Sequence, residues 1–177
     1  RMLMKEMYEA KSWYNHYQEN IYHLKERIKG VHTITVVVEP DIKMSLKGFR
    51  FTYFEKAFGQ LFASENTRIT GDMFRIGEKE ITDIGNNVTI EYENMNFGNQ
   101  GCTSITICGR SQIETNTIHI HFIDNDGSET NQIIEIPYSE HYEEHTYTLE
   151  KVTGKKKVNL IFLPGSKFNL NWFRFSN

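Results

Sequence analysis

Three features are missing from the 177-residue sequence, and each absence excludes a class of protein. The net charge is only −3 and acidic and basic residues are interspersed, whereas a nucleic-acid-binding surface usually clusters Lys and Arg. No apolar run approaches the ~18 residues of a transmembrane helix. Residues 1–16 are too polar for a signal peptide. We therefore expect neither a nucleic acid nor a membrane as partner.

Cysteine is also scarce, with Cys102 and Cys108 as the two examples. They lie six residues apart in a strand-like segment, which separates them by roughly 20 Å if the strand is straight. A disulfide requires Cα atoms within ~7 Å. The spacing therefore predicts two free thiols, which favours a reducing compartment and hence the cytoplasm. Because the chain opens with Arg1 and not Met, we expect a piece of a longer protein that carries its own localisation signals elsewhere.

What the sequence does contain is a series of short segments in which polar and apolar residues alternate. Residues 117–122 alternate strictly, as a half-buried strand does, and residues 158–163 are nearly all apolar, as a strand covered on both faces would be. Turn residues separate the segments, and the sequence Asp-Asn-Asp-Gly at 124–127 predicts a hairpin. The other expected strands are residues 32–38, 46–53, 88–92, 104–108, 132–136, 146–150 and 169–175.

Many short strands without intervening helices indicate an all-β sandwich or barrel. One segment, residues 2–17, has helical spacing, with apolar side chains at Leu3, Met7, Ala10 and Tyr14. We therefore expect a short N-terminal helix in front of the strands.

An internal repeat divides the chain. Residues 17–51 align with residues 142–175 after one gap, and both copies share a Gly, a Pro and a Phe-Arg-Phe ending. Two hairpins of unrelated origin could resemble each other, but agreement at so many large residues favours a true repeat. We therefore predict that residues 1–53 hold a helix and the last strands of a preceding, truncated module, and that residues 54–177 form a complete one. The unpaired strands would need a neighbour to cover their edges.

No motif in the sequence requires catalysis. His141 and His145 fit the H-x-x-E-H pattern of zinc proteases, but that chemistry needs both on one face of a helix. The segment leads into strand-like alternation, which would place the two residues roughly 13 Å apart. Acidic residues are plentiful, yet the sequence singles out no pair for glycoside hydrolysis. We expect a non-catalytic fragment.

Two further patterns resemble metal-binding sites, but each has a simpler interpretation. Asp124, Asp126 and Glu129 resemble the start of a calcium loop but lack the later ligands, and a hairpin turn accounts for them. His119 and His121 lie two apart on a predicted strand with no third ligand in view, which is typical of a solvated strand face.

Aromatic and amide side chains near predicted loops are the remaining candidates. Aromatic rings stack on the apolar faces of sugars, and Asn or Gln side chains bind sugar hydroxyls. Tyr138 and Tyr142 lie in a predicted loop, and Asn86, Asn87 and Asn169 lie where strands begin. A single aromatic residue is more often part of a core than a ligand platform, so both interpretations stay open.

Three segments resemble carbohydrate-binding module family 6. They are DIGNNVTIEYENMNFGNQGCTSITICGRS at 83–111, the ending GSKFNLNWFRF at 165–175, and the weaker opening LFASENTRITG at 61–71. In addition, KGFRF followed by EKAF, ASEN, GD and DIGNNV looks like the C-terminal region of family 2 glycoside hydrolases of the β-galactosidase type. The resemblance implies a jelly-roll β-sandwich of the galactose-binding-domain-like kind. It also implies that a β-linked galactoside or glycan is the ligand, and that catalytic domains lie upstream in the parent enzyme.

The resemblance also implies site residues. The family's cleft Asn matches Asn169 and its stacking Trp matches Tyr142, while the partner aromatic falls at Asn87. The family's structural calcium site uses a Glu near the first strand and an Asp in the last, which here are Glu65 (or Ser64) and Asn171. In the repeat copy, Ser45 and Lys47 replace the amides of Asn169 and Asn171.

The departures keep a second function open. Without an aromatic residue at Asn87 the family's aromatic pair is incomplete, which supports a structural or homodimerisation domain of the same enzyme as the alternative function. The strand pattern and the resemblance together predict a carbohydrate-binding accessory module, and the structural domain stays the alternative.

Overall fold

The computed structural model describes residues 5, 17–22, 24, 31–52 and 55–177. The chain divides into two compact units, Arg1–Tyr53 and Phe54–Asn177. Apart from Lys5 and Tyr17, the helix expected at residues 2–17 lies outside the described residues. No helix in the described part of the chain is long and apolar enough to span a membrane.

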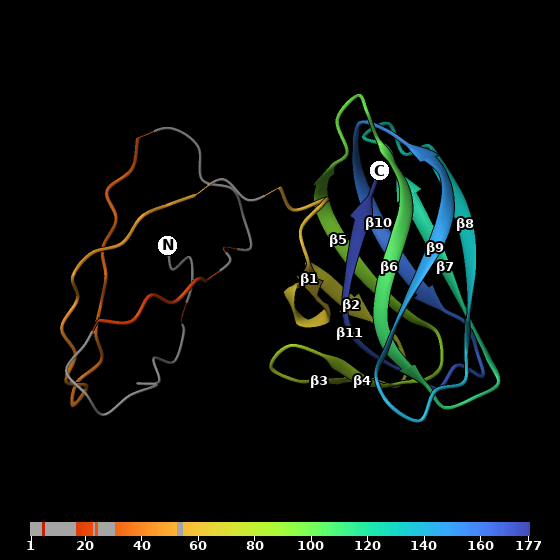
Figure 1. Cartoon of the computed structure of the whole chain (residues 1–177), viewed down its shortest axis with the longest axis horizontal. Coiled ribbons are helices and arrows are strands. Elements are labelled where there is room, and N and C mark those ends of the chain that lie inside the picture. Colours follow the sequence, from red (N-terminus) through yellow and green to blue (C-terminus); the bar gives the residue numbers. More distant parts are fainter. Residues whose placement is uncertain (1–4, 6–16, 23, 25–30, 53–54) are drawn as a thin grey trace. The chain divides into compact units, whose positions relative to one another are not determined.

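The second unit is a sandwich of two antiparallel sheets (Figure 1), which confirms the predicted all-β fold. The six-stranded sheet has the order β3-β4-β11-β6-β9, with β1 also pairing with β11, and the five-stranded sheet has the order β2-β5-β10-β7-β8. The elements are β1 (Leu61–Phe62), the 3-10 turn η1 (Ala63–Glu65), β2 (Arg68–Thr70), β3 (Arg75–Ile76), β4 (Ile81–Ile84), β5 (Val88–Asn96), β6 (Cys102–Ser111), β7 (Thr115–Ile123), β8 (Glu129–Pro137), β9 (Glu143–Val152), β10 (Lys155–Phe162) and β11 (Phe168–Ser176).

Alternation along the strands builds the core between the two sheets. In β5, for example, Val88, Ile90 and Tyr92 are fully buried while Thr89 and Glu91 face outward. Aromatic rings fill the middle of the sandwich, where Phe97 packs edge-on against both Phe122 and Phe175. Because one side of each strand packs into this core, the other side forms the outer face of its sheet.

Chain order shows how the sheets are connected. From β4 to β7 successive strands alternate between the two sheets, and so do β8 to β11, which is the jelly-roll arrangement. β7 and β8 form the predicted hairpin, with Ile123 opposite Glu129 across the turn. β10 departs from expectation, because its outer face has no covering layer and leaves Asn159 and Ile161 half-buried. Its apolar run is therefore a central strand with one face toward solvent.

Two irregularities set the geometry of one end of the six-stranded sheet. On β11 the register shifts between Leu170, opposite Gly109, and Trp172, opposite Cys108, so Asn171 is an extra residue. On β4, Asp83 has a φ of 52°, and the pairing with β11 also shifts there. Such bulges re-aim side chains, and here they turn both Asn169 and Trp172 to the outer face.

The first unit contains no strand within residues 31–52, so the strands expected at 32–38 and 46–53 are not formed in this part. It does contain a turn, in which the Ile42 amide donates to the Glu39 carbonyl oxygen at 3.4 Å and Asp41 has a φ of 72°. The assignment of this segment to a preceding module stays a prediction.

Candidate functional site

The predicted residues Tyr142 and Asn169 meet on the outer face of the six-stranded sheet. Tyr142 immediately precedes β9, and its hydroxyl donates a hydrogen bond to Glu80 in the turn between β3 and β4. A side-chain hydrogen bond joins Tyr142 to Asn169, near the start of β11. Tyr142 is 39% exposed, so its ring is accessible from solvent. Residues from three distant parts of the chain thus form one polar cluster beneath an exposed aromatic ring.

Asp83 holds Asn169 in place from the other side. The Asp83 backbone amide donates to the Asn169 Oδ1 atom at 2.9 Å, and the Asp83 carboxylate lies 3.2 Å from the Arg75 Nε atom. Because Oδ1 already accepts from Asp83, the amide nitrogen of Asn169 is the group available for the Tyr142 oxygen. The bulge at Asp83 therefore orients Asn169.

Electrostatics explain the protonation of this cluster. Burial raises the pKa of the Tyr142 phenol, and the hydrogen bond with Glu80 and the charge of that carboxylate raise it further, whereas the hydrogen bond with Asn169 lowers it. Tyr142 therefore stays neutral and donates to Glu80, so the site combines one carboxylate, one amide and one phenol.

Strand register adds further side chains to the same face. Asn169 pairs with Arg110 on β6, and Trp172 pairs with Cys108 two residues before Arg110. Directly opposed residues share a face, so Trp172 lies on the outer face with the Tyr142 cluster. The Nε atom of Arg110 is buried and has no hydrogen-bond partner among the described residues. Arg110 therefore brings an unsatisfied donor close to Asn169.

An open hollow of about 520 Å³ adjoins the cluster at Asp83. Its lining mixes charged, amide and apolar side chains, namely Asp72, Met73, Phe74, Arg75, Asp83, Ile84, Gln112, Lys167 and Phe168. A solvent-open hollow of this composition suits a polar ligand better than an apolar one.

The other two predicted sugar-binding residues, Asn87 and Tyr138, make their hydrogen bonds with residues outside the Tyr142 cluster. The Asn87 side chain donates to the Asp72 Oδ2 atom at 3.2 Å, in the turn between β4 and β5. Asn169 instead accepts its hydrogen bond from the Asp83 amide. Tyr138 follows β8, is 58% exposed, and bonds through its backbone amide to the Glu114 carbonyl oxygen.

The residues predicted for calcium form a weak donor set. η1, which ends at Glu65, packs against β11, which carries Asn171. However, the Glu65 Oε2 atom already accepts the Phe62 amide at 2.9 Å, and the Ser64 hydroxyl donates to the Glu78 carbonyl oxygen. No group of three His, Cys, Asp or Glu side chains that could hold a metal occurs in the described part. Calcium takes six to eight oxygen ligands from carboxylates, carbonyl groups and water, and of the residues predicted for it Glu65 alone is acidic. Calcium binding at Glu65 and Asn171 stays a prediction.

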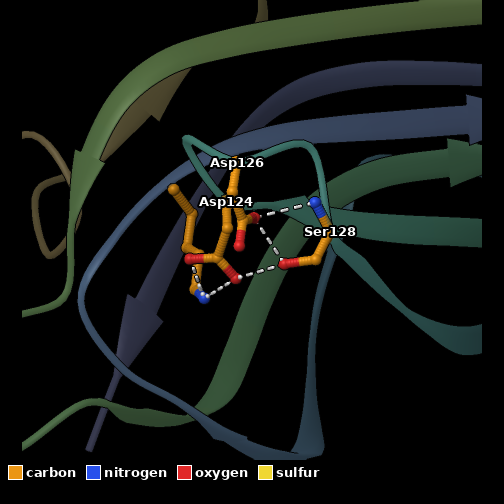
Figure 2. Close-up of polar contacts among 4 residues, drawn as sticks. Asp124, Asp126 and Ser128 are labelled. Carbon is orange, nitrogen blue, oxygen red and sulfur yellow. Dashed lines mark hydrogen bonds and ion pairs between the residues drawn. The ribbon is translucent and has the colours of Figure 1, made fainter.

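The turn between β7 and β8 (Figure 2) is the other calcium-like segment. Asp126 accepts hydrogen bonds from the Ser128 hydroxyl at 2.7 Å and from its amide at 2.9 Å. The Lys156 ammonium on β10 lies 2.5 Å from both carboxylate oxygens of Asp124. Lys156 thus pairs with one of the two carboxylates of the turn, and the antiparallel pairing of β7 with β8 on either side of it confirms the predicted hairpin.

Two smaller expectations are also resolved by the structure. Cys102 is buried, Cys108 is half-buried, and both are free thiols, as their spacing predicts. His145 lies within strand β9, so the H-x-x-E-H pattern is not helical and cannot form the zinc site of that motif.

Comparison with known proteins identifies the family of this fold. The family model for "Carbohydrate binding module (family 6)" matches residues 63–177, most of the chain. The chain belongs to this family. The module CsCBM6-3 from Clostridium stercorarium, in complex with cellobiose, is 26% identical with a TM-score of 0.58 and covers 68% of this chain and 95% of its own. No curated protein matches the chain.

Two further structures resemble the module. A family 6 carbohydrate-binding module from Clostridium cellulolyticum, in complex with xylose, is 25% identical with a TM-score of 0.58, over 68% of this chain and 98% of its own. A family 43 arabinoxylan arabinofuranohydrolase from Bacillus subtilis shares the fold at 22% identity and a TM-score of 0.54, over 68% of this chain and 27% of its own.

Of the residues in this cluster and on its face, the sequence predicted Tyr142 and Asn169 but not Glu80, Asp83, Arg110 or Trp172. Arg110 follows the alternation of β6, so it could have been assigned to the face of Cys108. Trp172 could not, because alternation from Asn169 without a bulge places Trp172 in the core. Glu80 carries no sequence pattern, since it reaches the module's site only through the turn between β3 and β4.

Proposed function

We propose that residues 54–177 bind carbohydrate on the outer face of the six-stranded sheet, as the non-catalytic accessory module of a larger enzyme. The observation that carries the proposal is the cluster in which Tyr142, Glu80 and Asn169 converge on an exposed face. Membership of a family of carbohydrate-binding modules supports it. The alternation of β6 and the bulge in β11 place Arg110 and Trp172 on the same face.

The chemistry of the cluster suits a sugar. The Tyr142 ring offers an apolar surface for the C–H face of a pyranose, which is the usual role of an aromatic ring at such sites. Glu80 accepts hydrogen bonds from hydroxyls, while Asn169 and Arg110 supply donors. A ligand hydroxyl that takes the place of the Tyr142 hydroxyl at Glu80 would exchange one hydrogen bond for another.

The ligand we propose is a β-linked galactoside or glycan. Related modules were solved with cellobiose and with xylose, so a panel must include gluco- and xylo-configured sugars beside galactosides. Because the Tyr142 ring has no opposing aromatic residue at Asn87 or Asp83, we expect a dissociation constant of about 1 mM, or roughly −4 kcal/mol.

Calorimetric titration of the full chain with this panel tests the proposal. Tyr142→Ala and Asn169→Ala should each weaken binding by about tenfold or more, since each removes one of few contacts. Tyr22→Ala is the matched control, because Tyr22 is similarly exposed, at 40%, and lies in the first unit. No saturable binding at millimolar sugar, or equal affinity of wild type and Tyr142→Ala, would refute sugar binding at this face. Tyr138→Ala decides separately whether the exposed Tyr138 contributes.

The parent enzyme we propose is a family 2 glycoside hydrolase of the β-galactosidase type, with its catalytic domains upstream. The support is the order of segments from KGFRF at 47–51 to DIGNNV at 83–88. In the Bacillus subtilis arabinofuranohydrolase the similar region is 27% of that chain, so the fold does occur within a much larger hydrolase. Nitrophenyl glycoside assays of this chain should give no turnover, whereas the parent should hydrolyse the β-galactoside.

A structural or dimerisation role of the same module is the second candidate. It is favoured by the missing opposing aromatic residue, since Asn87 is engaged with Asp72 instead. Light scattering of the parent with and without residues 54–177 separates the two roles. A parent that loses its oligomeric state without the module, together with a module that binds no sugar, supports the structural role.

A further inference from the structure

The repeat predicted from the sequence has a structural counterpart. When Gly30 is aligned with Gly154, each residue from 30 to 51 aligns without a gap with the residue 124 positions later. In the second copy these residues form β10, a turn and β11.

The turn is the same in both copies. The Ser166 amide donates to the Leu163 carbonyl oxygen at 3.2 Å, and the Ile42 amide donates to the Glu39 carbonyl oxygen at 3.4 Å. A proline follows the acceptor residue in each copy, and the next residue has a positive φ, 93° at Gly165 and 72° at Asp41. Pro at the second position and a positive φ at the third define a type II turn. Asp41 adopts this conformation although glycine is the residue that favours it.

The inward positions also agree. In the second copy seven side chains on β10 and β11 are at most 1% exposed: Val158, Leu160, Phe162, Phe168, Leu170, Phe173 and Phe175. Their counterparts in the first copy are all apolar but 37–59% exposed: Ile34, Val36, Val38, Met44, Leu46, Phe49 and Phe51. Even the edge-to-face contact of the last two rings recurs, at 5.6 Å for Phe173 with Phe175 and 5.8 Å for Phe49 with Phe51. The first copy therefore carries the apolar residues that form a sandwich core in the second copy, but here their side chains are exposed.

We propose that residues 31–51 are the β10–β11 hairpin of a second sandwich of this family, and that a polypeptide carrying the equivalents of β4, β5, β6 and β7 covers their apolar face. In the complete module β10 lies between β5 and β7, and β11 lies between β4 and β6. A second copy of residues 54–177 is not the partner, because its β4–β7 are already paired with its own β10 and β11. The partner is thus an open sandwich that lacks its last two strands.

The second sandwich would not repeat the sugar site. Ser45 replaces Asn169 and Gly48 replaces Trp172, while the inward residues stay apolar. The substitutions fall on the outer face and spare the core, so we infer that the completed sandwich is structural.

A graft tests the inference in the full chain and does not depend on sugar binding. Residues 158–175 are replaced by the sequence of residues 34–51, so that β4–β7 of the complete module act as the partner. The matched control grafts residues 33–50 at the same place, which shifts the apolar face by one position onto the outer face. We expect cooperative thermal unfolding of the graft and not of the control. We also expect amide exchange of the grafted residues to slow by about a hundredfold or more relative to residues 34–51 in their own position.

The full graft could fail to fold because many small packing defects add up, even if each segment suits its position. Two half grafts therefore test the strands separately. One replaces residues 158–162 by residues 34–38, and the other replaces residues 168–175 by residues 44–51, each beside its frame-shifted control. Cooperative unfolding of either half graft, with an unfolded control, supports the proposal. If the full graft and both half grafts unfold no more cooperatively than their controls, residues 31–51 do not encode this hairpin and the proposal fails.

Discussion

The side-chain amide of Gln132 forms two hydrogen bonds with the backbone of Glu150. The Gln132 Nε2 atom donates to the Glu150 carbonyl oxygen at 3.0 Å, and the Gln132 Oε1 atom accepts the Glu150 amide at 2.7 Å. Gln132 lies on β8, the edge strand of the five-stranded sheet, and Glu150 lies on β9, the edge strand of the other. The Gln132 side chain thus forms with Glu150 the two backbone hydrogen bonds that a neighbouring strand would form. It joins the two sheets at their edge strands.

Gln132→Ala should therefore expose backbone groups of β9 that are otherwise paired. We expect the free energy of unfolding to fall by about 1–2 kcal/mol. We also expect self-association to rise with concentration, because an unpaired edge accepts strands from other copies. Urea denaturation and analytical ultracentrifugation measure the two effects. Thr130→Ala, at an exposed position on the same strand, is the control, and an equal effect of both substitutions would contradict this role of Gln132.

Gly109 on β6 should tolerate no side chain. A Cβ atom there would lie 2.2 Å from Phe168 Cζ and 3.0 Å from the Asn169 carbonyl oxygen, and Phe168 is fully buried. Gly109→Ala should destabilise the module by about 1–3 kcal/mol through overpacking, and should weaken sugar binding by shifting Asn169. Urea denaturation and calorimetry measure these effects. Gly48→Ala, which meets no atom within 4 Å, should change neither quantity.

The Tyr142 phenol should ionise above the ordinary tyrosine pKa of about 10. The ultraviolet absorbance of tyrosinate is followed as the pH is raised. The difference between wild type and Tyr142→Phe isolates this group from the other tyrosines. Glu80→Gln removes the charge but leaves the burial, so the midpoint should fall while staying above the ordinary value. An equal midpoint in wild type and Glu80→Gln would show that Tyr142 does not contact Glu80 in solution, and a wild-type midpoint at or below the ordinary value would contradict the burial as well.

Cys102 should make stability decrease at alkaline pH. Burial raises the pKa of its thiol to about 11, although hydrogen bonds with the backbone of Val152 and of Cys102 itself oppose the shift. Between about pH 9 and 11 the folded chain keeps a proton that the unfolded chain has lost. The free energy of unfolding therefore falls as pH rises through this window, by about 1 kcal/mol between pH 8 and 10.

Urea denaturation of Cys102→Ala at the two pH values tests this. The substitution should reduce the pH dependence of the free energy of unfolding, and more so than Cys108→Ala does, because Cys108 is less buried. An unchanged pH dependence in Cys102→Ala would assign the effect to other groups.

Calcium should stabilise the Asn171→Asp variant more than the wild-type chain. The substitution adds a second carboxylate next to η1, where Glu65 lies. Binding to the folded state alone raises Tm by mass action. Thermal melts in calcium chloride and in a chelator measure the shift, with Asn94→Asp as the control for added charge. An equal calcium-dependent rise of Tm in wild type would show that neutral oxygens complete a site without the second carboxylate.

Alternation predicted the strands from β5 to β11 because each packs one face against a continuous core. It failed for β1 to β4, which are two to four residues long and too short to show a period. In β4, moreover, Asp83 adopts a positive φ, which ends the alternation after Ile81 and Thr82.

The site was predictable only in part for the same reason. Tyr142 and Asn169 emerged because they belong to recognisable segments, whereas Glu80 depends on how far a turn reaches across the sheet. Residues 32–38 show the converse. Their apolar alternation is clear, yet no strand forms in this structure, because a strand needs neighbours that the described chain does not provide.

The extra residue in β11 gives that strand two reading frames. Up to Leu170 the even-numbered side chains enter the core, and from Phe173 onward the odd-numbered ones do. Removing Asn171 would merge the frames, because the tryptophan would then follow Leu170 directly and face outward, with Phe173 and Phe175 still facing inward. The deletion would therefore spare the core and remove the local bend of β11 that aims the outer-face side chains. A position that is inconspicuous in composition thus shapes the outer face, and its deletion should weaken sugar binding more than it lowers the free energy of unfolding.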